Sequence, residues 1–275
     1  MTFTHLRPLL RVFAILVILG SLTGCLSAGD QGEAPASDPP EARPGVVLAS
    51  PSISPRSAAL KSPLYRTPPI AKIKCKLPLL EEDSWGSMRR YMQAVSGCLD
   101  RVWARQFAKM HASYTPPKRK YLAKRIKTTA CDGLTPPKGA YGVYCPSNKT
   151  YYVLADRSSW ASYHAFWAAH LVAHEHSHYI QDLVSILNYH AELDTKARNQ
   201  QDRLLAENRL EDQAGCFAAA ALQAMRDTLP SWSEFISMYR SEKDLKLYGV
   251  WLDRGHNGGR LGSCNTWTAP MKKIG

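Results

Sequence analysis

Apolar residues recur at helical spacing over long stretches of the chain. Residues 160–193 contain no Gly or Pro, and residues 196–227 contain no Pro. Apolar side chains three or four positions apart form one face of a helix, so both stretches predict amphipathic helices. Ser158 or Ser159 is expected to cap the first helix. Residues 87–110 predict a further amphipathic helix by the same spacing.

A β-hairpin is predicted just before the first of the two long helices. Residues 142–145 and 151–154 are rich in Val and Tyr, and the segment between them, Pro-Ser-Asn-Lys, is typical of a turn. The sequence therefore predicts an α+β fold: a mainly helical domain with a small hairpin or sheet next to the helix of residues 160–193.

This helix carries the pentapeptide HExxH, from His174 to His178. Residues four apart on a helix point to the same side, so both imidazoles can bind one zinc ion, and Glu175 can act as the general base. His170 lies one turn earlier, and a turn rises about 5.4 Å, so it cannot join the pair on the same ion. It stays a candidate for a supporting or substrate contact.

A catalytic zinc ion needs a third protein ligand. Glu211 lies on the apolar face of the stretch 196–227, where a carboxylate is costly unless it is paired or bound to metal. Gly215 beside it would let a second helix approach closely. Glu207 is also on this face and is the alternative ligand. The plain alternative is that both glutamates are solvated on a long helix.

Two strings of sequence carry a family resemblance. AHEHSHYIQ at residues 173–181 and RLEDQAGCFA at residues 209–218 resemble the putative neutral zinc metallopeptidases of bacteria, whose patterns are roughly AHExGHHVQ and ELQADCFAG. CDG and YGVYCP upstream, and WLDRG and CNTW downstream, are similar to other segments of that family, so that the resemblance spans about residues 75–267. It implies a zincin-type fold with His174, His178 and Glu211 as zinc ligands and Glu175 as base.

The chain departs from the family pattern at Gly215, where the family has Asp. In zincins such an Asp commonly orients a ligand histidine, and losing such a partner typically weakens metal affinity or activity about 10- to 100-fold. Asp212 or a backbone carbonyl could substitute for it, or the site is weaker. Candidates for stabilising the oxyanion are His256, Tyr179 and Arg254.

The N-terminus predicts a lipoprotein. A basic start and an apolar run precede Leu22-Thr23-Gly24-Cys25, which matches the lipobox. We expect a signal peptide at residues 1–24, lipidation of Cys25, a Pro-, Ser- and Ala-rich tether over residues 25–69 and one domain over residues 70–275. The protein is then exported and anchored by lipid to the membrane, facing outside the cytoplasm.

Cysteine number and charge agree with export. Six cysteines remain after Cys25, an even number that suits disulfides in an oxidising compartment. Of fifteen possible pairings, chain order suggests neighbours, whereas zinc binding is the alternative, unsupported by any CxxC pair. The suggested pairs are Cys75 with Cys98, Cys131 with Cys145 and Cys216 with Cys264. The net charge of +12 favours anionic lipids or wall polymers over nucleic acid and carries no function by itself.

Taken together, these features predict a membrane-tethered, extracytoplasmic peptidase with one zinc ion per chain and a peptide or protein substrate. The alternative is a non-catalytic zincin-fold lipoprotein that serves as a binding or scaffold module at the cell envelope, and the glycine at position 215 motivates it.

Overall fold

The computed structural model describes residues 53–81, 83–124, 131, 140–155 and 165–275. The signal peptide, Cys25 and the capping serines 158 and 159 lie outside these residues. The helices and strands, in chain order, are α1 (Pro55–Lys61), α2 (Trp85–Ala108), β1 (Lys118–Leu122), β2 (Gly142–Cys145), β3 (Thr150–Leu154), α4 (Ala165–Leu183), α5 (Ile186–Lys196), α6 (Gln200–Gln223), α7 (Trp232–Ser241) and α8 (Lys246–His256). Short 3-10 turns follow α1 and α8.

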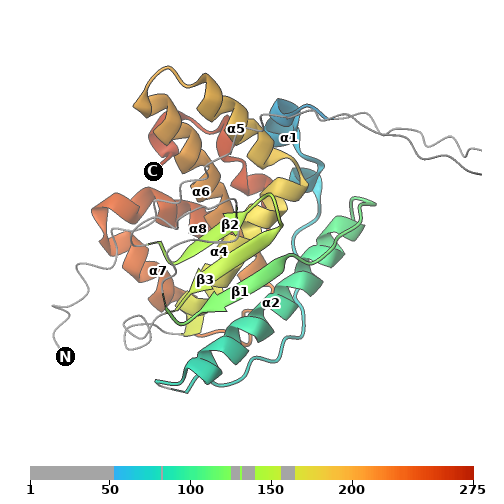
Figure 1. The fold of residues 1–275 in the computed structure, drawn as a ribbon, viewed down its shortest axis with the longest axis vertical. Helices are drawn as coiled ribbons and strands as arrows, with labels where there is room; N and C mark the ends of the chain where they lie inside the picture. Colours follow the sequence, from blue (N-terminus) through green and yellow to red (C-terminus); the bar gives the residue numbers. More distant parts are fainter. Residues whose placement is uncertain (1–52, 82, 125–130, 132–139, 156–164) are drawn as a thin grey trace, which may run out of the picture.

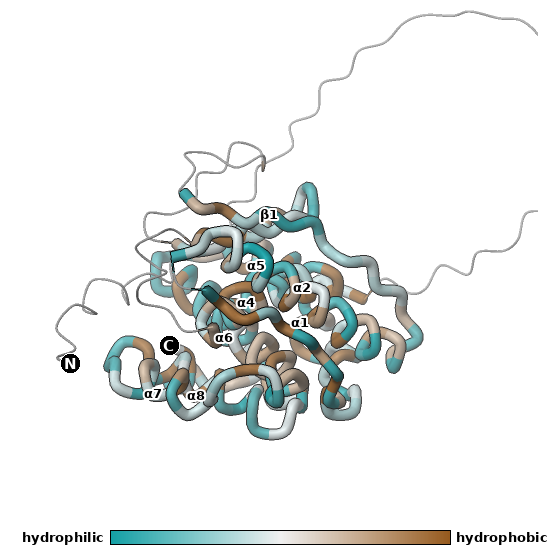
Figure 2. The backbone as a smooth tube through the Cα atoms, turned by 90° about the horizontal axis from the view of Figure 1, so that it is seen from below, coloured by the Kyte–Doolittle hydropathy of each residue, from teal (hydrophilic) through white to brown (hydrophobic). Residues whose placement is uncertain are grey.

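Helix α4 lies at the centre of the fold (Figure 1). Strands β2 and β3 and helix α2 pack against it, α6 packs against it as well, and α8 packs on α6. All residues of α4 from Phe166 to Gln181 are buried. A helix buried on every side needs partners all round. Figure 2 shows the hydrophobic segments of α4 and α6 toward the interior of the molecule.

The sheet has three strands in the order β1-β3-β2. Strands β2 and β3 form the predicted antiparallel hairpin, and β1 pairs with β3 in parallel. Strand β1 was not predicted, because Lys118, Arg119 and Lys120 indicate only a solvated basic segment. Main-chain pairing at the sheet edge makes it a strand. The predicted α+β class, mainly helical with a small sheet beside the HExxH helix, is confirmed.

The predicted helix over residues 160–193 is two helices. Helix α4 ends at Leu183 and α5 begins at Ile186, with Ser185 between them at φ 62°. A left-handed residue interrupts helical geometry, and Ser gives no sequence signal for that break. Helix α6 lies within the predicted stretch 196–227, and the side chain of Asn199 caps it by accepting from the backbone N–H of Asp202.

Three disulfides join the cysteines in the predicted neighbour pairs, and the alternative of zinc binding by these residues is wrong. The pairs are Cys75–Cys98, Cys131–Cys145 and Cys216–Cys264. The third joins α6 to the 3-10 turn Leu261–Cys264. It therefore links the helix of Glu211 to the C-terminal segment.

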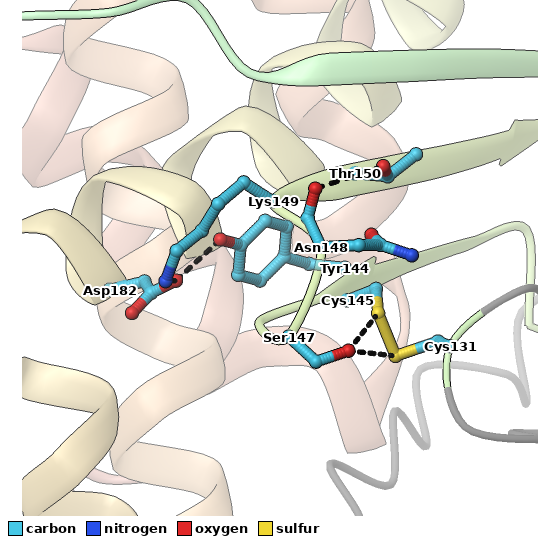
Figure 3. The surroundings of a disulfide bond; sticks show 8 residues. All are labelled: Cys131, Tyr144, Cys145, Ser147, Asn148, Lys149, Thr150 and Asp182. Carbon is cyan, nitrogen blue, oxygen red and sulfur yellow. Dashed lines mark hydrogen bonds and ion pairs between the residues drawn. A yellow bond between two sulfur atoms is a disulfide. The ribbon is translucent and has the colours of Figure 1, made fainter. Parts of the chain in front are cut away.

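The hairpin is fastened to the end of α4 (Figure 3). Tyr144 of β2 donates to Oδ2 of Asp182 at 2.5 Å, and Nζ of Lys149 lies 2.7 Å from the same oxygen. The Cys131–Cys145 bond holds the other side of the hairpin, where Ser147 lies beside both sulfur atoms. The sheet therefore has a fixed position over the HExxH helix.

The segment predicted to be tether is partly folded. Helix α1 packs against α5, and Ala58, Ala59 and Leu64 are buried. Residues 53–69 therefore belong to the domain, because their small and apolar side chains are buried in contacts that the linear pattern did not reveal. In the part of the chain with described placement, none of the helices has the length and apolar character that crossing a membrane requires.

Candidate metal centre

His174 and His178 from α4 meet Glu211 from α6 in the interior. Oε2 of Glu211 is 3.0 Å from Nε2 of His174, and its Oε1 is 3.4 Å from Nε2 of His178. The two Nε2 atoms are 3.1 Å apart. One ligand atom from each residue lies within 4.8 Å of the others, and all three side chains are buried. The structure therefore brings together the three residues that the sequence predicted as ligands.

The carboxylate and the imidazoles hold each other in place electrostatically. Burial alone would raise the pKa of Glu211, but the His178 charge and the hydrogen bond from His174 hold it well below its usual range. Burial lowers the pKa of the His178 imidazole, but the charge of Glu211 outweighs burial and raises this pKa to about 9. Burial lowers the pKa of His174. The centre therefore carries a negative carboxylate at neutral pH.

These donors suit a zinc ion. Two imidazole nitrogens and one carboxylate are an established ligand set of catalytic zinc sites. Oε1 of Glu211 is buried and makes no hydrogen bond with any residue that the structure describes. The alternative ligand Glu207 points elsewhere, with Oε2 at 3.0 Å from Nε2 of His190 on α5. The geometry therefore supports Glu211 over Glu207 as the third ligand.

Glu175 lies beside this centre with a free carboxylate. It is fully buried, and within the described ranges neither of its oxygens has a hydrogen-bond partner. Burial raises the pKa of the Glu175 carboxyl to about 8, the His178 charge opposes this, and the Glu211 charge adds to it. A carboxylate so poised near neutral pH suits a general base.

Strand β2 leaves room for Glu175. A Cβ atom at Gly142 would overlap Oε1, Cδ and Cγ of Glu175. The glycine is buried in the strand opposite Val153. Sequence reasoning placed Gly142 in the hairpin but did not connect it with the base, because the contact joins residues 33 positions apart (175 − 142 = 33).

Each ligand histidine has a partner on its second ring nitrogen. Nδ1 of His178 is 2.9 Å from Oε1 of Gln181, whose amide donates to the carbonyl of Leu210 and to Gln213. Gln181 is three residues after His178, so helical spacing could have indicated it. Nδ1 of His174 is 3.1 Å from the hydroxyl of Tyr248 on α8, a contact for which the sequence gives no local signal.

The remaining candidates have other surroundings. Asp212, one of the two substitutes considered for the carboxylate missing at position 215, accepts from the backbone N–H of Gly275 at 3.1 Å. His256 stacks on Trp232, with ring centroids 4.0 Å apart, and Arg254 lies over the ring of Trp251. Tyr179 donates to the carbonyl of Thr115. The structure does not place these four with the predicted ligands.

His170 does lie beside the centre. Its Nε2 is 3.3 Å from the hydroxyl of Tyr248, the same oxygen that contacts His174. Burial, followed by the His174 charge, lowers the pKa of His170 well below its usual value. It is therefore a neutral imidazole linked to a ligand histidine through a phenol.

Comparison with known proteins agrees with this geometry. Residues 79–232, more than half of the 275-residue chain, match the family described as putative neutral zinc metallopeptidase. The matched segment contains the HExxH helix and Glu211 and ends before α8. No curated protein and no solved structure matches the chain. The chain therefore belongs to the putative neutral zinc metallopeptidase family.

Proposed function

We propose that this protein hydrolyses peptide bonds at a zinc centre formed by His174, His178 and Glu211. One observation carries the proposal: a buried metal-ligand group lies beside Glu175, a buried carboxylate without hydrogen-bond partners among the described residues. An unpartnered buried carboxylate costs stability, so its presence is expected only where function requires it. The family assignment supports the same chemistry.

The residues of the site have separate roles in metal binding, proton transfer and ligand positioning. His174, His178 and Glu211 would hold the zinc ion, which would supply Lewis-acid polarisation of the scissile carbonyl and a lowered pKa for a water molecule. Glu175 accepts the proton of the attacking water on its free carboxylate and delivers it to the leaving amine. Gln181 fixes the ring of His178 by accepting from its Nδ1–H.

We further propose that the enzyme works outside the cytoplasm on a lipid anchor at Cys25. The lipobox motif and the three disulfides support this location, because disulfides persist in oxidising compartments. A tether of about residues 26–52 would then hold the folded domain near the membrane. Peptides or proteins of the envelope are the corresponding substrate class.

The proposal is tested by separating metal binding from hydrolysis in the purified full-length protein. We expect about one zinc per chain and a chelator-sensitive cleavage of a mixed peptide library. Glu175→Gln should keep the zinc, because the residue is not a ligand, and lose hydrolysis. A fully active Glu175→Gln protein would show that the proposed mechanism is wrong.

Glu211 and Glu207 provide a matched pair for the ligand assignment. They lie one turn apart on α6, and each contacts a histidine. Glu211→Gln should lose most of the bound zinc, whereas Glu207→Gln should retain it. The reverse result would transfer the ligand role to Glu207.

The non-catalytic alternative has lost the observation that motivated it. It depended on Gly215 leaving a ligand histidine without a partner. The hydroxyl of Tyr248 contacts Nδ1 of that histidine. Zinc binding without any peptide cleavage would nevertheless favour a scaffold role.

A further inference from the structure

The phenol of Tyr248 contacts the ligand His174 at Nδ1, the ring nitrogen that does not face Glu211. Nε2 of His174 faces Glu211, whereas its Nδ1 is 3.1 Å from the hydroxyl of Tyr248. With zinc on Nε2, the ring of His174 would carry its proton on Nδ1 and would donate it to the phenol oxygen. In that state the hydroxyl of Tyr248 would donate its own proton to Nε2 of His170, which lies 3.3 Å away. Among the described residues, the hydroxyl therefore contacts both histidines, and these contacts orient it.

Gly215 provides the space for this phenol. A Cβ atom at position 215 would lie 2.6 Å from Oη and 2.7 Å from Cε2 and Cζ of Tyr248. Carbon atoms do not approach so closely, so a side chain at 215 and the ring of Tyr248 exclude each other. The family pattern has Asp at this position. The absence of a carboxylate at position 215 is therefore what allows the phenol of Tyr248 to lie there.

A second glycine brings α8 close enough for Tyr248 to reach. Gly255 lies seven residues after Tyr248, on the same face of α8. A Cβ atom at Gly255 would overlap the carbonyl of Cys216, the residue after Gly215. Helices α6 and α8 thus cross in close contact at this point, and the Cys216–Cys264 bond holds the following segment against α6. The position of the phenol is set by the backbone packing.

We propose that Tyr248 is the positioning residue for the ligand His174, in the place that the family pattern gives to an aspartate one turn after Glu211. The inference rests on the proposed zinc centre and adds a residue beyond the segment that matches the family. A neutral phenol fixes the ring without placing a second negative charge behind the ligand.

The first test removes only the hydroxyl. Tyr248→Phe keeps the ring in its buried place, and zinc affinity, measured in competition with a chromophoric chelator, should fall about 10- to 100-fold. Tyr239→Phe is the matched control. Tyr239 is also buried, its ring lies 5.5 Å from that of Tyr248, and no hydrogen bond from it to a ligand histidine is found among the described residues. Equal affinities of the two variants would overturn the role of Tyr248.

The second test exchanges the phenol for the family carboxylate. Gly215→Asp alone should weaken zinc binding, because the new side chain meets the ring. Tyr248→Leu lacks Oη, Cζ and Cε2, so Gly215→Asp in that background has room to contact His174. The double variant should bind zinc at least about 10-fold more tightly than Tyr248→Leu alone. A purely structural role predicts additive losses instead, and that result would overturn the inference.

Zinc titration does not require hydrolysis, so the two proposals fail in different ways. A wild-type protein that binds zinc but shows unchanged affinity in Tyr248→Phe would overturn the role of Tyr248 alone. A wild-type protein without zinc affinity would overturn the proposed function, and this inference with it.

Discussion

Replacing Gly142 with alanine tests whether the general base depends on an empty position in strand β2. The new methyl group would occupy the space of Oε1, Cδ and Cγ of Glu175. Gly142 is buried, and its strand pairs with β3 and packs on α4. The overlap can therefore be relieved only by moving Glu175 or the strand.

The expected magnitude follows from the overlap. Forcing an extra methyl group into packed space costs about 1–3 kcal/mol. Alanine in a strand regains about 0.5–1 kcal/mol of this relative to glycine. We expect a net loss of about 1–2 kcal/mol in the free energy of unfolding. Displacing a catalytic group by about 1 Å can lower the rate about 100-fold, so peptide hydrolysis should fall by that order. Zinc content should not change, because the three atoms nearest to the methyl group all belong to Glu175, which is not a zinc ligand.

Thermal unfolding, zinc analysis and peptide hydrolysis of the same samples measure these effects. Gly97→Ala on α2 is the control, since a Cβ atom there has nothing within 4 Å. It should gain about 0.5–1 kcal/mol and keep full activity. The cost of Gly142→Ala should also disappear in a Glu175→Ala background, where the colliding carboxylate is gone. An equal cost in both backgrounds would refute the reasoning.

Four further outcomes are expected. Replacing Cys216 and Cys264 with serine should lower the free energy of unfolding by about 4 kcal/mol, the chain-entropy value for their separation of 48 residues, as denaturant titration can show. Burial lowers the pKa of His178, but Glu211 raises it to about 9, so protons compete with zinc below that pH. Zinc affinity should therefore fall about tenfold per unit between about pH 8 and pH 6 in calorimetric titrations, and a pH-independent affinity would contradict this. Gln181→Ala should weaken zinc binding about 10- to 100-fold in the same titration. Cys25→Ser should move the protein out of the membrane fraction, and unchanged membrane association would refute the lipid anchor.

The sequence by itself determined the parts of the site that depend on local periodicity. His174 and His178 are four residues apart, so any helix brings them together, and no tertiary contact is needed to see it. Glu211 could be predicted because a carboxylate on an apolar helix face needs a partner. The disulfide pairs followed from chain order, and the main helices and the hairpin followed from apolar spacing.

Only the tertiary structure decided which residues surround the ligands. The break at Ser185 is a left-handed residue, strand β1 depends on main-chain pairing with β3, and the segment before residue 70 folds through its contact with α5. None of these leaves a periodic signal in the sequence. Gly142 shapes the space of Glu175 across 33 positions, and Tyr248 reaches His174 across 74. Such contacts arise where α6 packs on α8 or where strand β2 packs on α4. No local sequence pattern identifies the residues that make them. In the sequence, Gly215 indicates the loss of a carboxylate that would orient a ligand histidine. In the fold, the missing side chain leaves space for the phenol of Tyr248, which contacts that histidine.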